Sequence, residues 1–170
     1  TRTYDANGNL TSDGQRGYVW NARNQLTSVN GVATASFQYD GLGRRMTKTV
    51  GGASTSFLYD GFNAVQELSG VSPTANLLTG LRIDEIFSRT DASGTRSFLV
   101  DGLGSTLALL DAAAIMQSQY NYESYGKTVA TGISSSNSFQ FTGRENDNTG
   151  LYYYRARNYD PTIGRFISED

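Results

Sequence analysis

Short runs of alternating apolar and polar residues follow one another along the chain, and many of them end at a glycine. The runs Arg44–Val50 and Thr55–Tyr59 are predicted strands, because side chains alternate between the two faces of an extended segment. Gly51-Gly52 lies between them and predicts a hairpin turn, since glycine adopts positive φ without steric cost. In such strands we expect the aromatic residues to share one packed face; the residues concerned are Phe37, Tyr39, Phe57 and Tyr59.

One unit recurs along the chain: an apolar run ends in an aromatic or aliphatic residue, and Asp-Gly or a related pair follows. Clear copies start at positions 4, 20, 39 and 59, which are 16, 19 and 20 residues apart. The copies are Tyr4-Asp5, Trp20-Asn21, Tyr39-Asp40, Tyr59-Asp60, Val100-Asp101 and Tyr122-Glu123. A period of about 20 residues holds two strands and two turns. It predicts an all-β protein, an antiparallel meander with little or no helix.

The segment Thr106–Met116 conflicts locally with this pattern, because it is rich in leucine and alanine and has good helix propensity. It lies between two copies of the repeat, where the period requires strand, turn and strand. We therefore expect strands over Ser105–Leu110 and Ile115–Tyr122, with a turn near Asp111.

Two further segments interrupt the pattern of strands. Ser72-Pro73-Thr74 predicts one loop, and Ser134–Asn137 predicts another. A short helical turn over Thr74–Thr79 remains an alternative.

Composition narrows the chemistry that the chain can perform. With 14 basic and 16 acidic residues the net charge is −2, so we expect no nucleic-acid partner. The apolar runs are far shorter than the ~20 residues that cross a bilayer, so we expect no membrane insertion. The sequence has neither cysteine nor histidine, which excludes disulfides, thiol nucleophiles, imidazole bases and Cys/His zinc sites. We expect no cofactor and no metal.

The repeats resemble the YD repeats of the Rhs family over essentially the whole chain. The C-terminal part resembles the Rhs-associated core, on the segments Phe141–Glu145, Thr149–Pro161 and Gly164–Asp170. The resemblance implies a β-sheet strip that spirals into a hollow shell, as in bacterial exported toxins, toxin-complex subunits and, more distantly, teneurins. It divides the chain into a YD-repeat strip, residues 1–132, and a core segment, residues 133–170, continuous with the same sheet and truncated at its C-terminal end.

The function that this resemblance implies is structural: a segment of an exported β-shell that encloses a C-terminal effector or toxin. The expected partners are that effector and neighbouring Rhs repeats, with self-association of the chain through open sheet edges. The expected location is secreted or at a bacterial cell surface, with the export signal outside this chain. Two alternatives remain open: a truncated aspartate-dependent self-cleaving core, and a cell-surface segment for adhesion or carbohydrate binding.

Asp170 is the candidate catalytic residue that the resemblance implies, with its partner missing. In the family the matching aspartate precedes Pro-x-Gly, and a second aspartate follows further on; a pair of carboxylates can share a proton and act as acid and base. Asp160 is the alternative partner, although Asp160-Pro161 also suits a turn. Arg155, Arg157 and Arg165 are candidates to orient that turn. We expect no catalytic activity from the chain as given.

Other motifs favour structural roles. Asp5–Asn9 imitates the first half of a calcium loop, but Leu10 and Arg16 stand where the loop needs glycine and glutamate, so we predict a turn. Asn146–Asn148 is a similar case. The Gly-Leu-Gly sequences at 41–43 and 102–104 lack the following helix of a phosphate loop. Tyr152–Tyr154 alternates between two strand faces, and we expect one of them to pack in the core.

Overall fold

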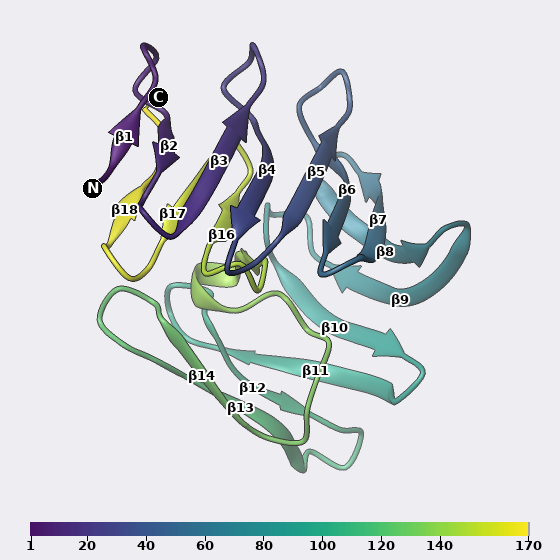
Figure 1. Cartoon of the computed structure of the whole chain (residues 1–170). Helices are drawn as coiled ribbons and strands as arrows, with labels where there is room; N and C mark the ends of the chain where they lie inside the picture. The colour runs from purple at the N-terminus through teal and green to yellow at the C-terminus, as the bar shows by residue number, and fades with distance from the viewer. Residues whose placement is uncertain (170) are drawn as a thin grey trace. The chain divides into compact units, whose positions relative to one another are not determined.

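The computed structural model describes residues 1–169, and in that range the regular structure is β-strand apart from one 3-10 turn, Phe141–Gly143 (Figure 1). Fourteen strands form one sheet in which each strand neighbours the next along the chain, and their pairing is antiparallel. The predicted all-β antiparallel meander is therefore confirmed. No helix within the described residues has the length and apolar character to span a bilayer.

Every strand of the large sheet is short, as the repeat period requires. The strands are β1 (Thr3–Tyr4), β2 (Leu10–Ser12), β3 (Arg16–Trp20), β4 (Leu26–Gly31), β5 (Ala35–Tyr39), β6 (Arg45–Val50), β7 (Ala53–Asp60), β8 (Asn63–Ser69), β9 (Ser72–Thr79), β10 (Ile86–Asp91), β11 (Gly94–Val100), β12 (Thr106–Leu110), β13 (Met116–Tyr122) and β14 (Thr128–Gly132).

The end of the chain forms a second, four-stranded sheet. Its strands, in order, are β15 (Glu145–Asn146), β16 (Tyr152–Tyr154), β17 (Arg157–Asp160) and β18 (Arg165–Phe166). The expectation that this segment continues the same sheet is wrong, because the fourteen-stranded sheet ends at β14 and β15 to β18 form a sheet of their own. The boundary between the YD-repeat strip and the core segment, placed between residues 132 and 133, remains a prediction.

The predicted hairpin around Asp111 is confirmed, with strands β12 and β13 on either side. The Asp111 Oδ1 accepts hydrogen bonds from the backbone N–H groups of Ala113, at 2.9 Å, and Ile115, at 3.0 Å. Both strands pair with neighbours, so sheet pairing overrides the local helix propensity. The irregular segment at Ser134–Asn137 also agrees with the prediction.

The predicted loop at Ser72-Pro73-Thr74 and the alternative helical turn over Thr74–Thr79 are both wrong, because these residues belong to β9. Pro73 pairs with Leu68 where the register of β8 and β9 shifts. A bulge interrupts the ladder locally, so a proline without an N–H group is tolerated there.

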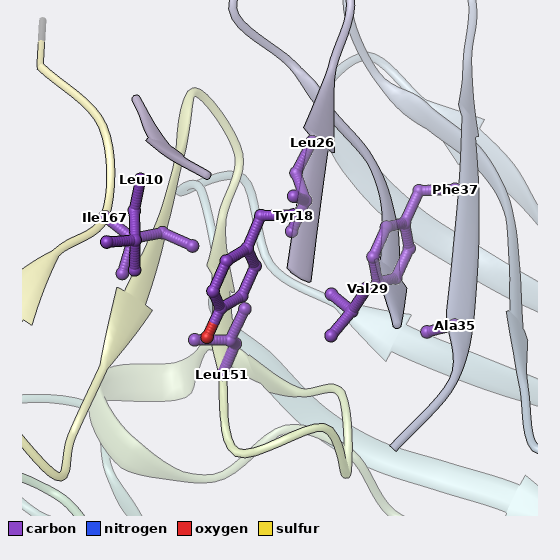
Figure 2. Packing of buried hydrophobic residues seen from close by; sticks show 8 residues of the cluster. All are labelled: Leu10, Tyr18, Leu26, Val29, Ala35, Phe37, Leu151 and Ile167. Atoms are coloured by element: carbon purple, nitrogen blue, oxygen red, sulfur yellow. The ribbon is translucent and has the colours of Figure 1, made fainter. Parts of the chain in front are cut away.

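Two compact units make up the chain, and each has its own core. The first unit combines residues 1–56 with the segment from 147 onward. Figure 2 shows its core, in which Leu151 and Ile167 from the C-terminal segment lie among residues of β2 to β5; the buried set is Leu10, Tyr18, Leu26, Val29, Ala35, Phe37, Leu151 and Ile167. The backbone N–H of Leu10 also donates to the Ile167 carbonyl at 2.8 Å. The N-terminal strands therefore depend on the C-terminal segment for their packing.

The second unit, residues 57–146, has a smaller core made of Phe57, Ala64, Leu77 and Phe139. The aromatic prediction is confirmed in both units. Phe37 and Phe57 are buried, whereas Tyr39 and Tyr59 are half-buried and pack against the same clusters.

Candidate functional site

The Tyr-Asp signature of the repeat is a hairpin loop that an aspartate closes. In the loop Asp40–Arg44, the Asp40 Oδ1 accepts hydrogen bonds from the N–H groups of Leu42 and Arg44, each at 2.9 Å. The N–H of Gly43 donates to the Asp40 carbonyl at 3.0 Å, and Gly43 has φ +83°. The aspartate side chain thus satisfies backbone donors that the turn leaves without strand partners.

The same arrangement recurs at Asp5, Asn21, Asp101 and Asp111, where the side-chain oxygen accepts from the N–H groups two and four residues on. At Asp5 the hydrogen bond from the Asn9 side chain is the main reason that the carboxyl pKa is lowered. At Asp40 burial opposes the change, but the hydrogen bonds from Arg44 outweigh it and lower the pKa. These aspartates are structural.

The first of these loops, Asp5–Asn9, is the turn that the sequence predicted in preference to a calcium site. Asp5 Oδ2 accepts a hydrogen bond from the Asn9 side-chain amide at 2.9 Å, so both carboxylate oxygens are used within the loop. Among residues 1–169 no three side chains of the metal-binding types gather closely enough to hold an ion. The glycine-rich loops at 41–43 and 102–104 lead into strands β6 and β12.

Asp160, the candidate partner of a catalytic aspartate, is buried and held on both carboxylate oxygens. Its Oδ1 accepts from the Thr162 N–H at 2.8 Å, and its Oδ2 lies 2.8 Å from Arg16 Nη2. This agrees with the predicted turn role. Asp170, the candidate catalytic residue itself, lies outside the described residues, and whether it has a catalytic role remains a prediction.

Arg16 supplies the cation that faces Asp160. Besides Asp160 it contacts Asp13, with 2.7 Å between Nε and Oδ2, and donates to the Thr149 carbonyl at 3.0 Å. Two of the arginines that were predicted to orient this turn have other surroundings. Arg157 stacks over Phe166 at 3.9 Å from the ring centre, and Arg155 occupies a left-handed turn position with φ 64°. Arg16 is 144 residues from Asp160 in sequence, so no local pattern signals the pair.

Arg16, Asp13, Tyr18 and Asp160 form one cluster, the Arg16 cluster, in which the pKa values of Asp13 and Tyr18 are shifted. Burial alone would raise the pKa of Asp13, but hydrogen bonds from the backbone N–H groups of Arg16 and Gln15, and from the Arg16 and Tyr18 side chains, lower it well below its usual range. Burial raises the pKa of Tyr18, and its hydrogen bond to Asp13 raises it further. The cluster therefore holds an ionised aspartate and a neutral tyrosine across the neutral pH range.

A second buried pair joins β6 to the C-terminal segment. Arg45 Nη1 lies 2.7 Å from Asp147 Oδ2, and both side chains are fully buried. The Arg45 guanidinium also lies 4.0 Å from the ring centre of Tyr153. Lys48 Nζ is 3.7 Å from the other Asp147 oxygen, beyond a hydrogen bond. Tyr152 and Tyr153 are both buried, so β16 packs on both faces rather than on the single face that we expected.

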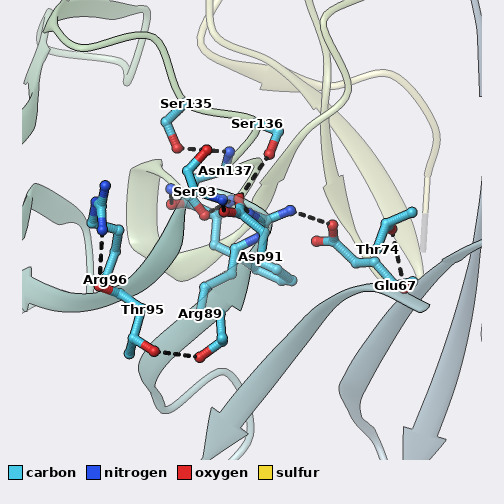
Figure 3. A network of polar contacts seen from close by, with 12 residues as sticks. Glu67, Thr74, Arg89, Asp91, Ser93, Thr95, Arg96, Ser135, Ser136 and Asn137 are labelled. Carbon is cyan, nitrogen blue, oxygen red and sulfur yellow. Dashed lines mark hydrogen bonds and ion pairs between the residues drawn. The ribbon is translucent and has the colours of Figure 1, made fainter. Parts of the chain in front are cut away.

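Figure 3 shows the corresponding network in the second unit, centred on the buried Arg89. Arg89 contacts Glu67 at 2.7 Å and Asp91 on its own strand. Asp91 in turn accepts from the Ser93 N–H at 2.8 Å and from the Ser136 hydroxyl at 3.4 Å. Burial would lower the pKa of Arg89, but its bond to Glu67 and the two negative charges raise it. This network ties the segment after β14 to the repeat strands of the same unit.

Comparison with known proteins agrees with this architecture. The chain is 33% identical to the tRNA3(Ser)-specific nuclease WapA of Bacillus spizizenii over 178 residues, which cover 99% of this chain but 8% of that protein. It is 30% identical to the double-stranded DNA deaminase toxin A of Burkholderia cenocepacia, covering 98% of this chain and 15% of the toxin. The chain thus spans a small part of the length of these relatives.

A solved structure shares the fold over nearly the whole chain. The crystal structure of TcdB2-TccC3-Cdc42 superposes with a TM-score of 0.78 at 25% identity, covering 98% of this chain and 9% of that one. The model of the teneurin YD-shell family matches residues 2–170. The resemblance to Rhs and YD repeats is thereby confirmed, and the chain belongs to the teneurin YD-shell family.

Proposed function

We propose that this chain is a wall segment of an exported shell that encloses a C-terminal effector. The observation that carries the proposal is the fourteen-stranded antiparallel meander, in which each strand neighbours the next in sequence. Such a sheet satisfies its backbone hydrogen bonds within the wall and lengthens by whole hairpins. A wall of this kind excludes water and proteases from whatever it surrounds.

The relatives support the effector part of the proposal. Two of them are named for activities, a tRNA nuclease and a DNA deaminase toxin, and this chain matches only 8% and 15% of their lengths. We infer that the activity of such proteins lies outside the matching wall and that this chain serves a protein of the same plan. Its partners are then its own effector and neighbouring repeats, and its location is outside the producing bacterium.

The role of the wall itself is architectural rather than catalytic. The buried carboxylates of Asp147, Asp160 and Glu67 and the half-buried carboxylate of Asp13 each contact an arginine of a repeat strand. These groups hold strands together.

The test is protease protection in the full-length protein that contains this chain. The effector should stay intact in wild-type protein under limited proteolysis and become digestible after Arg45→Ala, which breaks a fully buried ion pair. Lys127→Ala is the matched control, because Lys127 pairs with Glu123 on the exposed surface. Equal digestion of the effector in wild type and Arg45→Ala would refute enclosure by this wall. Fragmentation of the isolated chain that Asp160→Asn or Asp170→Asn abolishes would favour the self-cleaving alternative.

A further inference from the structure

The free edge of β14 differs from the other sheet edges of the described chain. The large sheet begins at β1 and ends at β14, and the small sheet begins at β15 and ends at β18. Three of these edge strands are two residues long, whereas β14 has five. Short edge strands and edge charges protect a sheet from pairing with another chain. The β14 sequence, Thr-Val-Ala-Thr-Gly, contains neither charge nor proline.

Hydrogen bonds at both ends of β14 define which backbone groups face its open edge. The Glu123 N–H donates to the Lys127 carbonyl at 2.9 Å, and the Ile133 N–H donates to the Gln117 carbonyl at 2.7 Å. The register that places Tyr120 opposite Ala130, continued to both ends of the strand, places Glu123 opposite Lys127 and Gln117 opposite Ile133. Both are therefore hydrogen-bonded pairs of directly opposed residues. Since such pairs alternate along an antiparallel ladder, the N–H and C=O groups of Ala130 and Gly132 point away from β13.

The residues at this edge are accessible. Val129, Ala130, Thr131 and Gly132 are all exposed, Val129 by 53%. In Figure 1 the strand lies beside β13, its only neighbour in the sheet order. The edge therefore presents open backbone donors and acceptors flanked by β-branched side chains, which is the surface used for strand addition.

We propose that the β14 edge pairs antiparallel with the same edge of a second copy of this chain. A two-fold axis at Ala130 places Ala130 opposite Ala130 and Val129 opposite Thr131 of the other copy. This register is self-complementary, because it opposes two β-branched side chains and no like charges. Lys127, the nearest charge, falls opposite Ile133 and is already paired with Glu123 at 3.1 Å.

The first test is the mass of the chain in solution as its concentration rises, measured by sedimentation equilibrium. Wild-type chain should form a dimer, and Ala130→Pro should weaken dimerisation at least tenfold. Proline removes an N–H that points away from β13, so pairing within the chain is kept. A wild-type chain that stays monomeric at every concentration overturns the proposal.

A charge exchange makes the test specific to the register and avoids any effect of proline on folding. Val129→Lys with Thr131→Lys places lysine opposite lysine across the two-fold axis and should weaken dimerisation at least tenfold. Val129→Lys with Thr131→Glu places lysine opposite glutamate and should restore it. Both variants change the same two exposed positions, so each is the control for the other. Equal dimerisation of the two variants would locate the contact elsewhere and reject this edge.

Discussion

Two arginines that are adjacent in sequence, Arg44 and Arg45, show two ways in which this chain fixes its fold. Arg44 closes its own loop, with Nε 2.7 Å from Asp40 Oδ2 and both side chains partly exposed. Arg45 reaches Asp147, 102 residues away, and both side chains are fully buried. The first interaction is local and repeats with the sequence period. The second joins the repeat strands to the C-terminal segment and has no local signal.

The largest expected difference in unfolding free energy is between alanine variants of these two arginines. Arg45→Ala leaves the Asp147 carboxylate buried without its cation and should cost about 3–5 kcal/mol of unfolding free energy. Arg44→Ala removes a loop contact near the surface and should cost less than about 1 kcal/mol. Urea unfolding followed by the fluorescence of Trp20, the single tryptophan, measures both. Equal losses would show that burial of the pair is energetically irrelevant.

Lowering the pH into the acid range should destabilise the fold through protonation of Asp13 in the Arg16 cluster. The pKa of Asp13 is below its ordinary value of 3.8 in the folded chain, so its contribution to stability is fully present above about pH 4. It is lost as the pH falls toward the folded pKa, by an amount on the order of 2–3 kcal/mol. Asp13→Asn should therefore flatten the acid limb of a stability curve more than Asp40→Asn does. If stability falls with the same slope in acid for both variants, Asp13 is not the group responsible for the acid limb.

At alkaline pH we expect the same cluster to cause a second fall in the curve of stability against pH. The pKa of Tyr18 is raised, so its contribution holds below about pH 10 and is lost as the pH rises through the folded value. Tyr18→Phe should remove this limb, which stability measurements between pH 9 and 12 would reveal.

A smaller effect is expected where an aspartate is replaced by its amide. Asp160→Asn removes the charge that faces Arg16 and should cost about 2 kcal/mol. Asp101→Asn should change stability by less than about 0.5 kcal/mol, because Asn21 already performs the same loop role with an amide oxygen. Thermal unfolding of the two variants checks this. A larger loss at Asp101 would mean that the repeat loops need the charge.

Small effects of opposite sign are expected at the fourth position of the repeat loop, where the backbone is left-handed. Gly104 has φ +82°, and a methyl group on its Cα would meet no neighbouring atom closer than 3.9 Å. Gly104→Ala should therefore cost about 1 kcal/mol through backbone strain alone. Ala114 occupies the matching position at φ 61°, and Ala114→Gly should stabilise the chain by about 0.5 kcal/mol. Calorimetry should show melting temperatures that shift in opposite directions.

The contrast between local and distant contacts also decides how much of the fold could be predicted from the sequence. The hairpins around Gly51-Gly52 and Asp111 were predictable, because glycine, aspartate and side-chain alternation act within a few residues. The loop predicted at Pro73 was wrong because a register shift between two strands accommodates the proline. The Arg16–Asp160 and Arg45–Asp147 pairs could not be predicted, since each depends on the path of the chain between its members. For the same reason the sequence did not predict that β15 to β18 form a separate sheet.

The placement of Leu151 and Ile167 in the core of the first unit has a consequence for biosynthesis. Residues 57–146 must be made before this part of the core can arrive. At ordinary translation rates of about 5–20 residues per second, roughly ninety residues take about 5–20 s. During that interval Leu10, Leu26 and Phe37 lack their final packing partners on the nascent chain. We expect the N-terminal strands to be a binding site for chaperones at the ribosome, and their release to follow synthesis of the last strands.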